Sequence, residues 1–172
     1  MRSVLAGGAL LVVSSCFLLG SDPPAAPVSS PWSAPGTEAR LYYDNGGGIR
    51  DSMRMVIRNA ETFDEVWGRA TAGQSSPPAM PTVDFGTEMV LLVAAGRMTP
   101  DDQIHVDSVR VHRERGADGE VDESMMVLVR VTDGCEDFNA AAYPLEIVRV
   151  RRFDGPVVFT ERSEPAPTCP GA

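Results

Sequence analysis

The feature that most constrains the fold is a run of seven apolar or small residues, from Met89 to Ala95, in the stretch MVLLVAA. A run this short with no polar alternation is typical of a central β-strand that is buried on both faces. Such a strand needs a layer of structure against each face. The sequence therefore predicts a layered fold, in which a helix supplies one layer and a second or curled sheet supplies the other.

A short amphipathic helix is predicted over residues 62–71. Its apolar residues recur at helical spacing on one face, at Phe63, Val66, Trp67 and Ala70. Thr62 is followed three residues later by Glu65, which fits a capping box at the start of the helix. We interpret Trp67 as part of the core and not as a platform for a ligand.

The rest of the domain reads as strands. Besides the central run, period-2 patterns or short apolar runs predict strands at 53–58, 103–114, 122–133, 145–152 and 157–160. Asp118-Gly119 marks a hairpin turn, and a slip in the alternation at Asp107-Ser108 predicts a β-bulge. The later connections are too short for crossover helices. We therefore expect an α+β fold that is mainly antiparallel, with about six strands in a curled sheet or small sandwich and one packed helix.

The N-terminus carries the pattern of an export signal. Arg2 provides a short positive region, and residues 4–19 are apolar or small throughout. This run is shorter than the roughly 20 residues that span a bilayer comfortably. Val13-Ser14-Ser15-Cys16 resembles a bacterial lipobox, in which an aliphatic residue and two small residues precede a lipidated cysteine. We predict a lipoprotein-type signal peptide over 1–15 and lipid attachment at Cys16; a plain secreted protein or an uncleaved anchor are the alternatives.

The segment after Cys16 reads as a tether. Residues 21–38 are rich in Pro, Ser and Ala, a composition that cannot bury enough apolar surface to fold. We expect the lipid anchor and tether to occupy 16–38 and a single domain to occupy 39–172. The expected location is the bacterial cell envelope, with the domain facing the periplasm or the exterior.

The number of cysteines agrees with this arrangement. The chain has three cysteines, so a lipidated Cys16 leaves Cys135 and Cys169 as an even pair in an oxidising compartment. A disulfide between them is the default expectation, and two unpaired thiols are the alternative.

Charge and composition exclude several kinds of function. The net charge is −9, which disfavours binding to nucleic acid. The chain contains no Lys, so no Lys-based enzyme chemistry is available. His105 and His112 do not belong to a dense pattern of metal ligands, and Cys135 lies beside Glu136-Asp137, which would raise the pKa of its thiol. We expect no catalytic site, no cofactor and no metal.

Acidic loops leave one alternative open. Residues 99–107 and 117–124 contain several carboxylates that are able to supply oxygen ligands to calcium, although neither loop has the spacing of a known calcium loop. The alternative function is therefore an envelope protein that binds calcium or a small ligand through these loops.

A series of short motifs runs through most of the predicted domain. In order along the chain these are Gly48-Ile49, Val56-Ile57, a helix that ends near Trp67, Val83-Asp84-Phe85, the apolar MVLLVAAG, Tyr143-Pro144 and the late GPVVF. In this order they resemble the C-terminal domain of the protease complex subunit PrcB family. The resemblance extends from about Gly46 to Phe159.

The resemblance implies a small, non-catalytic domain that is exported or lipid-anchored. The family's namesake is associated with a secreted protease complex, which it is thought to stabilise. The expected partner is therefore an envelope or secreted protein, with a protease as the first candidate, and the expected membrane contact is the lipid on Cys16.

One departure from the family pattern suggests a contact surface. The family has a Gly-rich turn after the central strand, whereas Gly96 is followed here by an acidic loop with two aspartates. We expect partner contacts in the loop 97–103 and on the basic face of the strand 145–152. The residues concerned are Arg97, Thr99, Asp101 and Asp102 in the loop, and Arg149, Arg151 and Arg152 on the strand; a merely solvated strand face is the alternative for the arginines.

Overall fold

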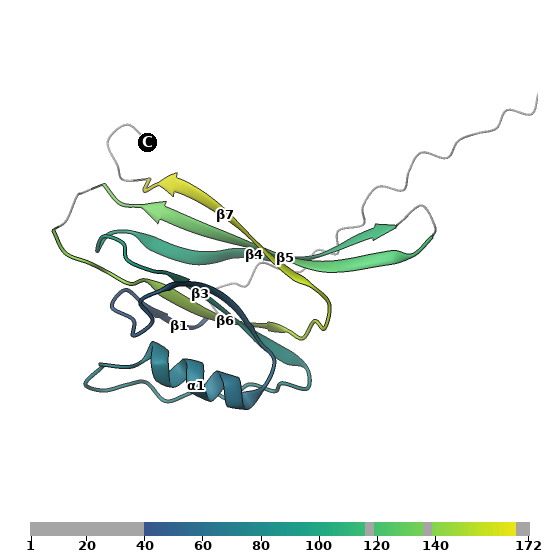
Figure 1. Ribbon diagram of the computed structural model, residues 1–172, viewed down its shortest axis with the longest axis horizontal. Coiled ribbons are helices and arrows are strands. Elements are labelled where there is room, and N and C mark those ends of the chain that lie inside the picture. Colours follow the sequence, from purple (N-terminus) through teal and green to yellow (C-terminus); the bar gives the residue numbers. More distant parts are fainter. Residues whose placement is uncertain (1–39, 116–118, 136–138, 168–172) are drawn as a thin grey trace, which may run out of the picture.

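The computed structural model describes residues 40–115, 119–135 and 139–167. Within them lie seven strands and one helix (Figure 1). The elements are β1 (Arg40–Asp44), β2 (Ser52–Ile57), α1 (Ala60–Ala70), β3 (Glu88–Ala95), β4 (Gln103–Arg115), β5 (Val121–Asp133), β6 (Leu145–Arg151) and β7 (Val157–Pro165). The expected α+β class is confirmed, with strands in two sheets.

The strands form a four-stranded sheet and a three-stranded sheet. The order of the first is β1-β6-β3-β2, and all of its neighbouring strands are antiparallel. The order of the second is β4-β5-β7. The predicted central run is β3, which lies inside the four-stranded sheet, and its residues from Met89 to Ala94 are buried.

Two apolar cores cover the two faces of β3. Alternate residues such as Val90 and Leu92 pack with Phe63 and Trp67 of α1. The residues between them, such as Leu91 and Val93, pack with the three-stranded sheet. The predicted layers are therefore confirmed as helix, four-stranded sheet and three-stranded sheet, in that order (Figure 1).

The start of α1 differs from the prediction. The helix begins at Ala60, and its N-cap is Asn59, whose side chain accepts a hydrogen bond from the Thr62 backbone N–H at 2.8 Å. Thr62 is therefore the third helical residue and cannot cap the helix, so the predicted capping box is wrong. The apolar face is confirmed, because Phe63, Val66, Trp67 and Ala70 are buried.

The predicted bulge is present in β4. The pairing of β4 with β5 shifts between Val106 and Ser108. Because one extra residue reverses the alternation, Ile104 and Val106 before the bulge and Val109 after it all reach the core between the sheets.

Three features of the strands differ from the prediction. β1 was not predicted, and β7 extends to Pro165, beyond the expected 157–160. β7 also pairs with β5 in parallel, which the expectation of short antiparallel connections did not include. The chain leaves β5, crosses to the four-stranded sheet as β6 and returns as β7 (Figure 1), so β6 takes the place that a crossover helix occupies in a βαβ unit.

The second face of β2 is also less exposed than its pattern predicts. Met53 and Met55 pack toward the helix, and Val56 packs toward the core between the sheets. Arg54 is only 16 % exposed and forms an ion pair with Glu161 of β7 at 2.5 Å. The outer strands of the two sheets are joined there, so the face expected to be wet is largely covered.

Candidate functional site

The acidic loop after β3 is held by its own hydrogen bonds. The Thr99 N–H donates to Asp102 Oδ2 at 2.7 Å, and the Thr99 hydroxyl donates to Asp101 Oδ1 at 2.8 Å. Asp102 Oδ1 accepts from the Gly134 N–H at 2.8 Å. Of the four predicted contact residues in the loop, Arg97 is exposed, whereas Thr99, Asp101 and Asp102 are half-buried and have structural partners.

The three predicted contact arginines do not form one basic patch. Arg149 lies 3.3 Å from Glu88. Arg152 pairs with Asp154 at 2.9 Å and donates to the Phe85 carbonyl at 2.6 Å. The Arg151 guanidinium has no hydrogen bond or ion pair with any described residue. Of these three arginines, Arg151 is therefore the one whose positive charge no described residue compensates.

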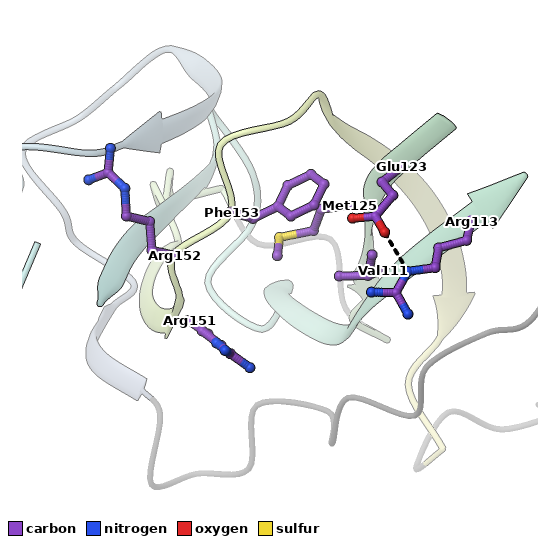
Figure 2. A pocket seen from close by; sticks show the side chains of 7 residues that line it. All are labelled: Val111, Arg113, Glu123, Met125, Arg151, Arg152 and Phe153. Carbon is purple, nitrogen blue, oxygen red and sulfur yellow. Dashed lines mark hydrogen bonds and ion pairs between the residues drawn. The ribbon is translucent and has the colours of Figure 1, made fainter. Parts of the chain in front are cut away.

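Arg151 lines a hollow at the end of the sandwich, shown in Figure 2. The hollow has a volume of about 230 Å³ and is lined by Val111, Arg113, Glu123, Met125, Arg151, Arg152 and Phe153. Val111 and Met125 are paired across β4 and β5, and with Phe153 they belong to the core between the sheets. The hollow thus has an apolar floor where the sandwich opens.

The turn that carries Phe153 is held by hydrogen bonds from an arginine side chain to its backbone carbonyls. Arg58 donates to the carbonyl oxygens of Phe153 and Gly155 at 3.2 and 3.1 Å. A Cβ at Gly155 would lie 2.7 Å from the Phe153 ring, so only glycine lets this ring pack so closely against the turn. The floor of the hollow is therefore preformed.

Only part of this hollow could be identified from the sequence. Arg151 and Arg152 were singled out there, but Phe153 was given no role. A usable signal is present in the sequence, because Phe153 stands directly between the arginines and the Asp154-Gly155-Pro156 turn.

A second surface is the outer face of the three-stranded sheet. Because side chains alternate along a strand, the residues between the core positions of β5 and β7 point outward. Met126 and Leu128 lie next to each other on this face, and Met126 is paired with Val158, which is 42 % exposed. A shallow hollow of about 250 Å³ here is lined by Ser108, Arg110, Met126, Leu128 and Thr160.

A buried carboxylate joins the two sheets at their other side. Glu146 of β6 is only 2 % exposed. Its Oε1 lies 2.5 Å from Arg40 Nε and 3.4 Å from His105 Nδ1, and its Oε2 accepts from the Val106 N–H at 2.5 Å. β4 is an outer strand of its sheet, so Glu146 satisfies a backbone donor that has no neighbouring strand there.

The pKa of Glu146 reflects these contacts. Burial alone would raise the pKa, but the hydrogen bonds from His105 and Val106 and the charge of Arg40 outweigh it and hold the pKa below its ordinary value of 4.5. His105 is also stacked on Tyr43 and contacts Gln103 through Nε2. Each polar group in the cluster has a partner, and we interpret the cluster as structural.

The remaining predicted sites lie partly outside the described residues. Cys16 and Cys169 lie outside them, as does the predicted tether. Cys135 is disulfide-bonded, and its pairing with Cys169 stays a prediction.

In the part of the chain that the structure describes, no group of three or more His, Cys, Asp or Glu side chains could hold a metal ion. In the acidic segment 99–107, Asp101 and Asp102 are engaged as given above, and Asp107 pairs with Arg130 at 3.1 Å. None of the helical residues described forms a segment long and apolar enough to cross a membrane.

The chain was compared with known proteins. No family model matches it, and neither a curated protein nor a solved structure matches it. The resemblance to the PrcB family stays a hypothesis based on the short motifs given above.

Proposed function

We propose that this chain is a non-catalytic binding or assembly module, tethered to the bacterial cell envelope by a lipid on Cys16, and that it docks an exported protein on the outer face of its three-stranded sheet. The PrcB-like motifs make a subunit of an exported protease complex the first partner to test. The tether follows from the lipobox-like stretch and the Pro-rich segment after it.

The observation that carries the proposal is the uneven covering of the two sheets. The four-stranded sheet is covered on one face by α1 and on the other by the second sheet. The three-stranded sheet has no such layer of described residues on its outer face, yet Met126, Leu128 and Val158 meet at its centre. The outward positions of an exposed sheet are normally polar, so an apolar centre here favours a docking surface.

The charged residues around this centre fit a protein interface. Arg130, Arg162, Asp107 and Glu164 form a network of ion pairs at one end. Arg110 of β4, which is paired with Met126, has no ion pair with a described residue. An apolar centre with Met, surrounded by a charged rim with Arg, is the usual composition of such interfaces.

The docking surface is tested by photo-crosslinking in cells. A photoreactive amino acid replaces Thr160 in the full-length chain, and adducts are identified by mass spectrometry. We expect one exported protein to be captured, and we expect Val158→Glu to reduce the adduct at least tenfold. Met80→Glu is the matched control, because Met80 is 45 % exposed and Val158 is 42 % exposed. Equal adducts in both variants, or none in the unmodified background, would contradict the docking surface.

The tether is tested separately by fractionation. Cys16→Ala should move the chain from the membrane fraction to the soluble exported fraction, and metabolic labelling with a fatty acid should disappear with it. Unchanged fractionation and labelling would refute lipid attachment at Cys16 and leave the docking surface to be judged on its own test.

A further inference from the structure

We propose that the hollow in Figure 2 binds a carboxylate attached to a short apolar body. Arg151 would bind the carboxylate, and the floor formed by Val111, Met125 and Phe153 would receive the apolar body. This site is distinct from the proposed docking surface, because its floor belongs to the core between the sheets and not to the outer face of the three-stranded sheet.

The charges that line the hollow point to an anion. Arg113 lies 2.5 Å from Glu123, so these two charges cancel. The Arg152 side chain is bound by Asp154 and by backbone carbonyls, and Figure 2 shows that its guanidinium points away from Met125 and Phe153. Arg151 is the one lining cation without a partner among the described residues. A single unpaired guanidinium is suited to a carboxylate, which it binds through two parallel hydrogen bonds.

The floor adds an apolar requirement. Met125 is 1 % exposed, and Val111 and Phe153 are partly buried against the same core. A small inorganic anion would leave the exposed parts of Val111 and Phe153 in contact with water, whereas an alkyl group would cover them. The preferred ligand therefore combines a negative charge with an apolar group.

The size of the hollow limits that group. Its volume of about 230 Å³ is below the roughly 300–1,000 Å³ of sites that enclose a whole drug-sized ligand. It suits one apolar side chain together with its carboxylate. Two sources offer this chemistry: the C-terminal residue of a polypeptide and a free short-chain acid.

The surrounding contacts make the site rigid before a ligand arrives. Arg58 fixes the Phe153–Gly155 turn through two carbonyls. The Met125 N–H donates to the Pro156 carbonyl at 2.8 Å, which joins the same turn to β5. A preformed site loses less affinity to the ordering of its residues.

Calorimetric titration of the full-length chain in lipid nanodiscs tests the proposal. The first probe is the peptide acetyl-Gly-Ala-Leu with a free carboxylate, the second is the same peptide as its C-terminal amide, and the third is 4-methylpentanoate. We expect the free acid to bind with saturation, and the amide to bind at least tenfold more weakly. Comparable binding of peptide and 4-methylpentanoate indicates free acids as the source, and preference for the peptide indicates a polypeptide C-terminus.

Variants connect the binding to the named residues. Arg151→Gln, which keeps most of the side chain's length and removes its charge, should weaken binding of the free acid at least tenfold. Arg69→Gln is the matched control, because Arg69 is another exposed arginine without an ion pair to a described residue and lies on α1. Equal affinity for acid and amide, no saturation at millimolar concentration, or an Arg151→Gln variant that binds like the unaltered chain would each overturn the proposal.

The outcome is separable from that of the docking surface. Val158→Glu leaves all residues of the hollow unchanged, so it should lose the photo-crosslinked partner and keep the affinity for the free acid.

Discussion

At the scale of single residues, Glu146 is the one charged residue that is buried among those the structure describes. It is 2 % exposed and contacts both sheets, because it lies on β6 and binds Arg40 of β1 and the backbone of β4. A buried charge whose partner is removed is left uncompensated, which commonly destabilises a protein by several kcal/mol.

Replacing Glu146 by Gln should lower the free energy of unfolding by about 2–4 kcal/mol at pH 7. The amide oxygen can still accept from Val106, but the amide has no charge to offer Arg40 or His105. Urea denaturation of the two proteins measures the difference. Glu123→Gln is a suitable control, since Glu123 pairs with Arg113 and both side chains are more than 40 % exposed, and its loss should cost less than about 1 kcal/mol.

The same pair of proteins should show a defined dependence on pH. The pKa of Glu146 in the folded state lies below its ordinary value of 4.5. A depressed carboxylate pKa contributes stability that is complete above the unfolded pKa and is lost as the pH falls through the folded pKa. The difference between unaltered chain and Glu146→Gln should therefore be constant from about pH 7 to 5 and shrink below 4.5; a difference that persists unchanged in acid would contradict this account.

Glu146 also marks a limit of the sequence analysis at this scale. In the stretch YPLEIVRVRR it stands among alternating apolar and charged residues, where a charge is ordinarily assigned to the wet face. Its burial depends on β1, whose Arg40 reaches it, and β1 was not predicted. A charge compensated by a residue 106 positions away has no local signal in the sequence.

At the scale of elements, the start of α1 offers a direct test of the corrected cap. Asn59→Ala removes the side-chain acceptor of the Thr62 N–H and should cost about 1 kcal/mol of unfolding free energy. Thr62→Ala keeps that backbone hydrogen bond, and because Ala has the higher helix propensity it should leave the unfolding free energy unchanged or raise it by a few tenths of a kcal/mol. Thermal or urea unfolding of the two variants decides between the two caps, and a larger effect at Thr62 would restore the predicted capping box.

The bulge in β4 gives a second test, because it decides which side chains reach the core. Deleting Asp107 removes the extra residue and should turn Val109 and Val111 toward the outer face, at a cost of more than about 3 kcal/mol. Asp107→Ala keeps the bulge and removes only exposed ion pairs with Arg130 and Arg162, so it should cost less than about 1 kcal/mol. Similar stability of the two variants would show that the bulge does not set the register.

Elements with a strong local pattern were predicted well. The apolar run at β3, the helical spacing of Phe63 and Val66, and the slip at Asp107-Ser108 are each visible within a few residues. Two features were not predicted: the strand β1 and the full length of β7. The residues of both segments are rich in polar groups. Both strands exist because they pair with β6 and β5, which are remote in the sequence, and local propensity does not reveal such pairing.

At the scale of the whole molecule, the layers could be predicted but the topology could not. The seven consecutive apolar or small residues of β3 must be covered on both faces of the strand, and this requirement predicts three layers. The parallel pairing of β5 with β7 requires knowing that β6 belongs to the other sheet. The candidate surfaces show the same limit. The three arginines were identified, but Arg149 pairs with Glu88 of β3 and Arg152 donates to the Phe85 carbonyl, and only the folded chain brings these partners together.

At the scale of the whole molecule, the parallel pairing of β7 with β5 brings the end of β7 close to the segment that carries Cys135. β7 ends beside the end of β5, where Asp133 pairs with Pro165 and the Ala166 N–H donates to the Asp133 carbonyl at 2.8 Å. Cys135 follows two residues after Asp133 and is disulfide-bonded. The predicted partner, Cys169, follows Pro165 by four residues, so a bond between Cys135 and Cys169 would fasten β7 at the open edge of its sheet.

Replacing both Cys135 and Cys169 by Ala should lower the free energy of unfolding by about 3–4 kcal/mol in the chain-entropy model. Cys135→Ala alone should have the same effect, whereas Cys16→Ala should leave stability unchanged. Proteolytic mapping without reductant should recover the two peptides as one species; a Cys16–Cys135 species instead would overturn both this pairing and lipid attachment at Cys16.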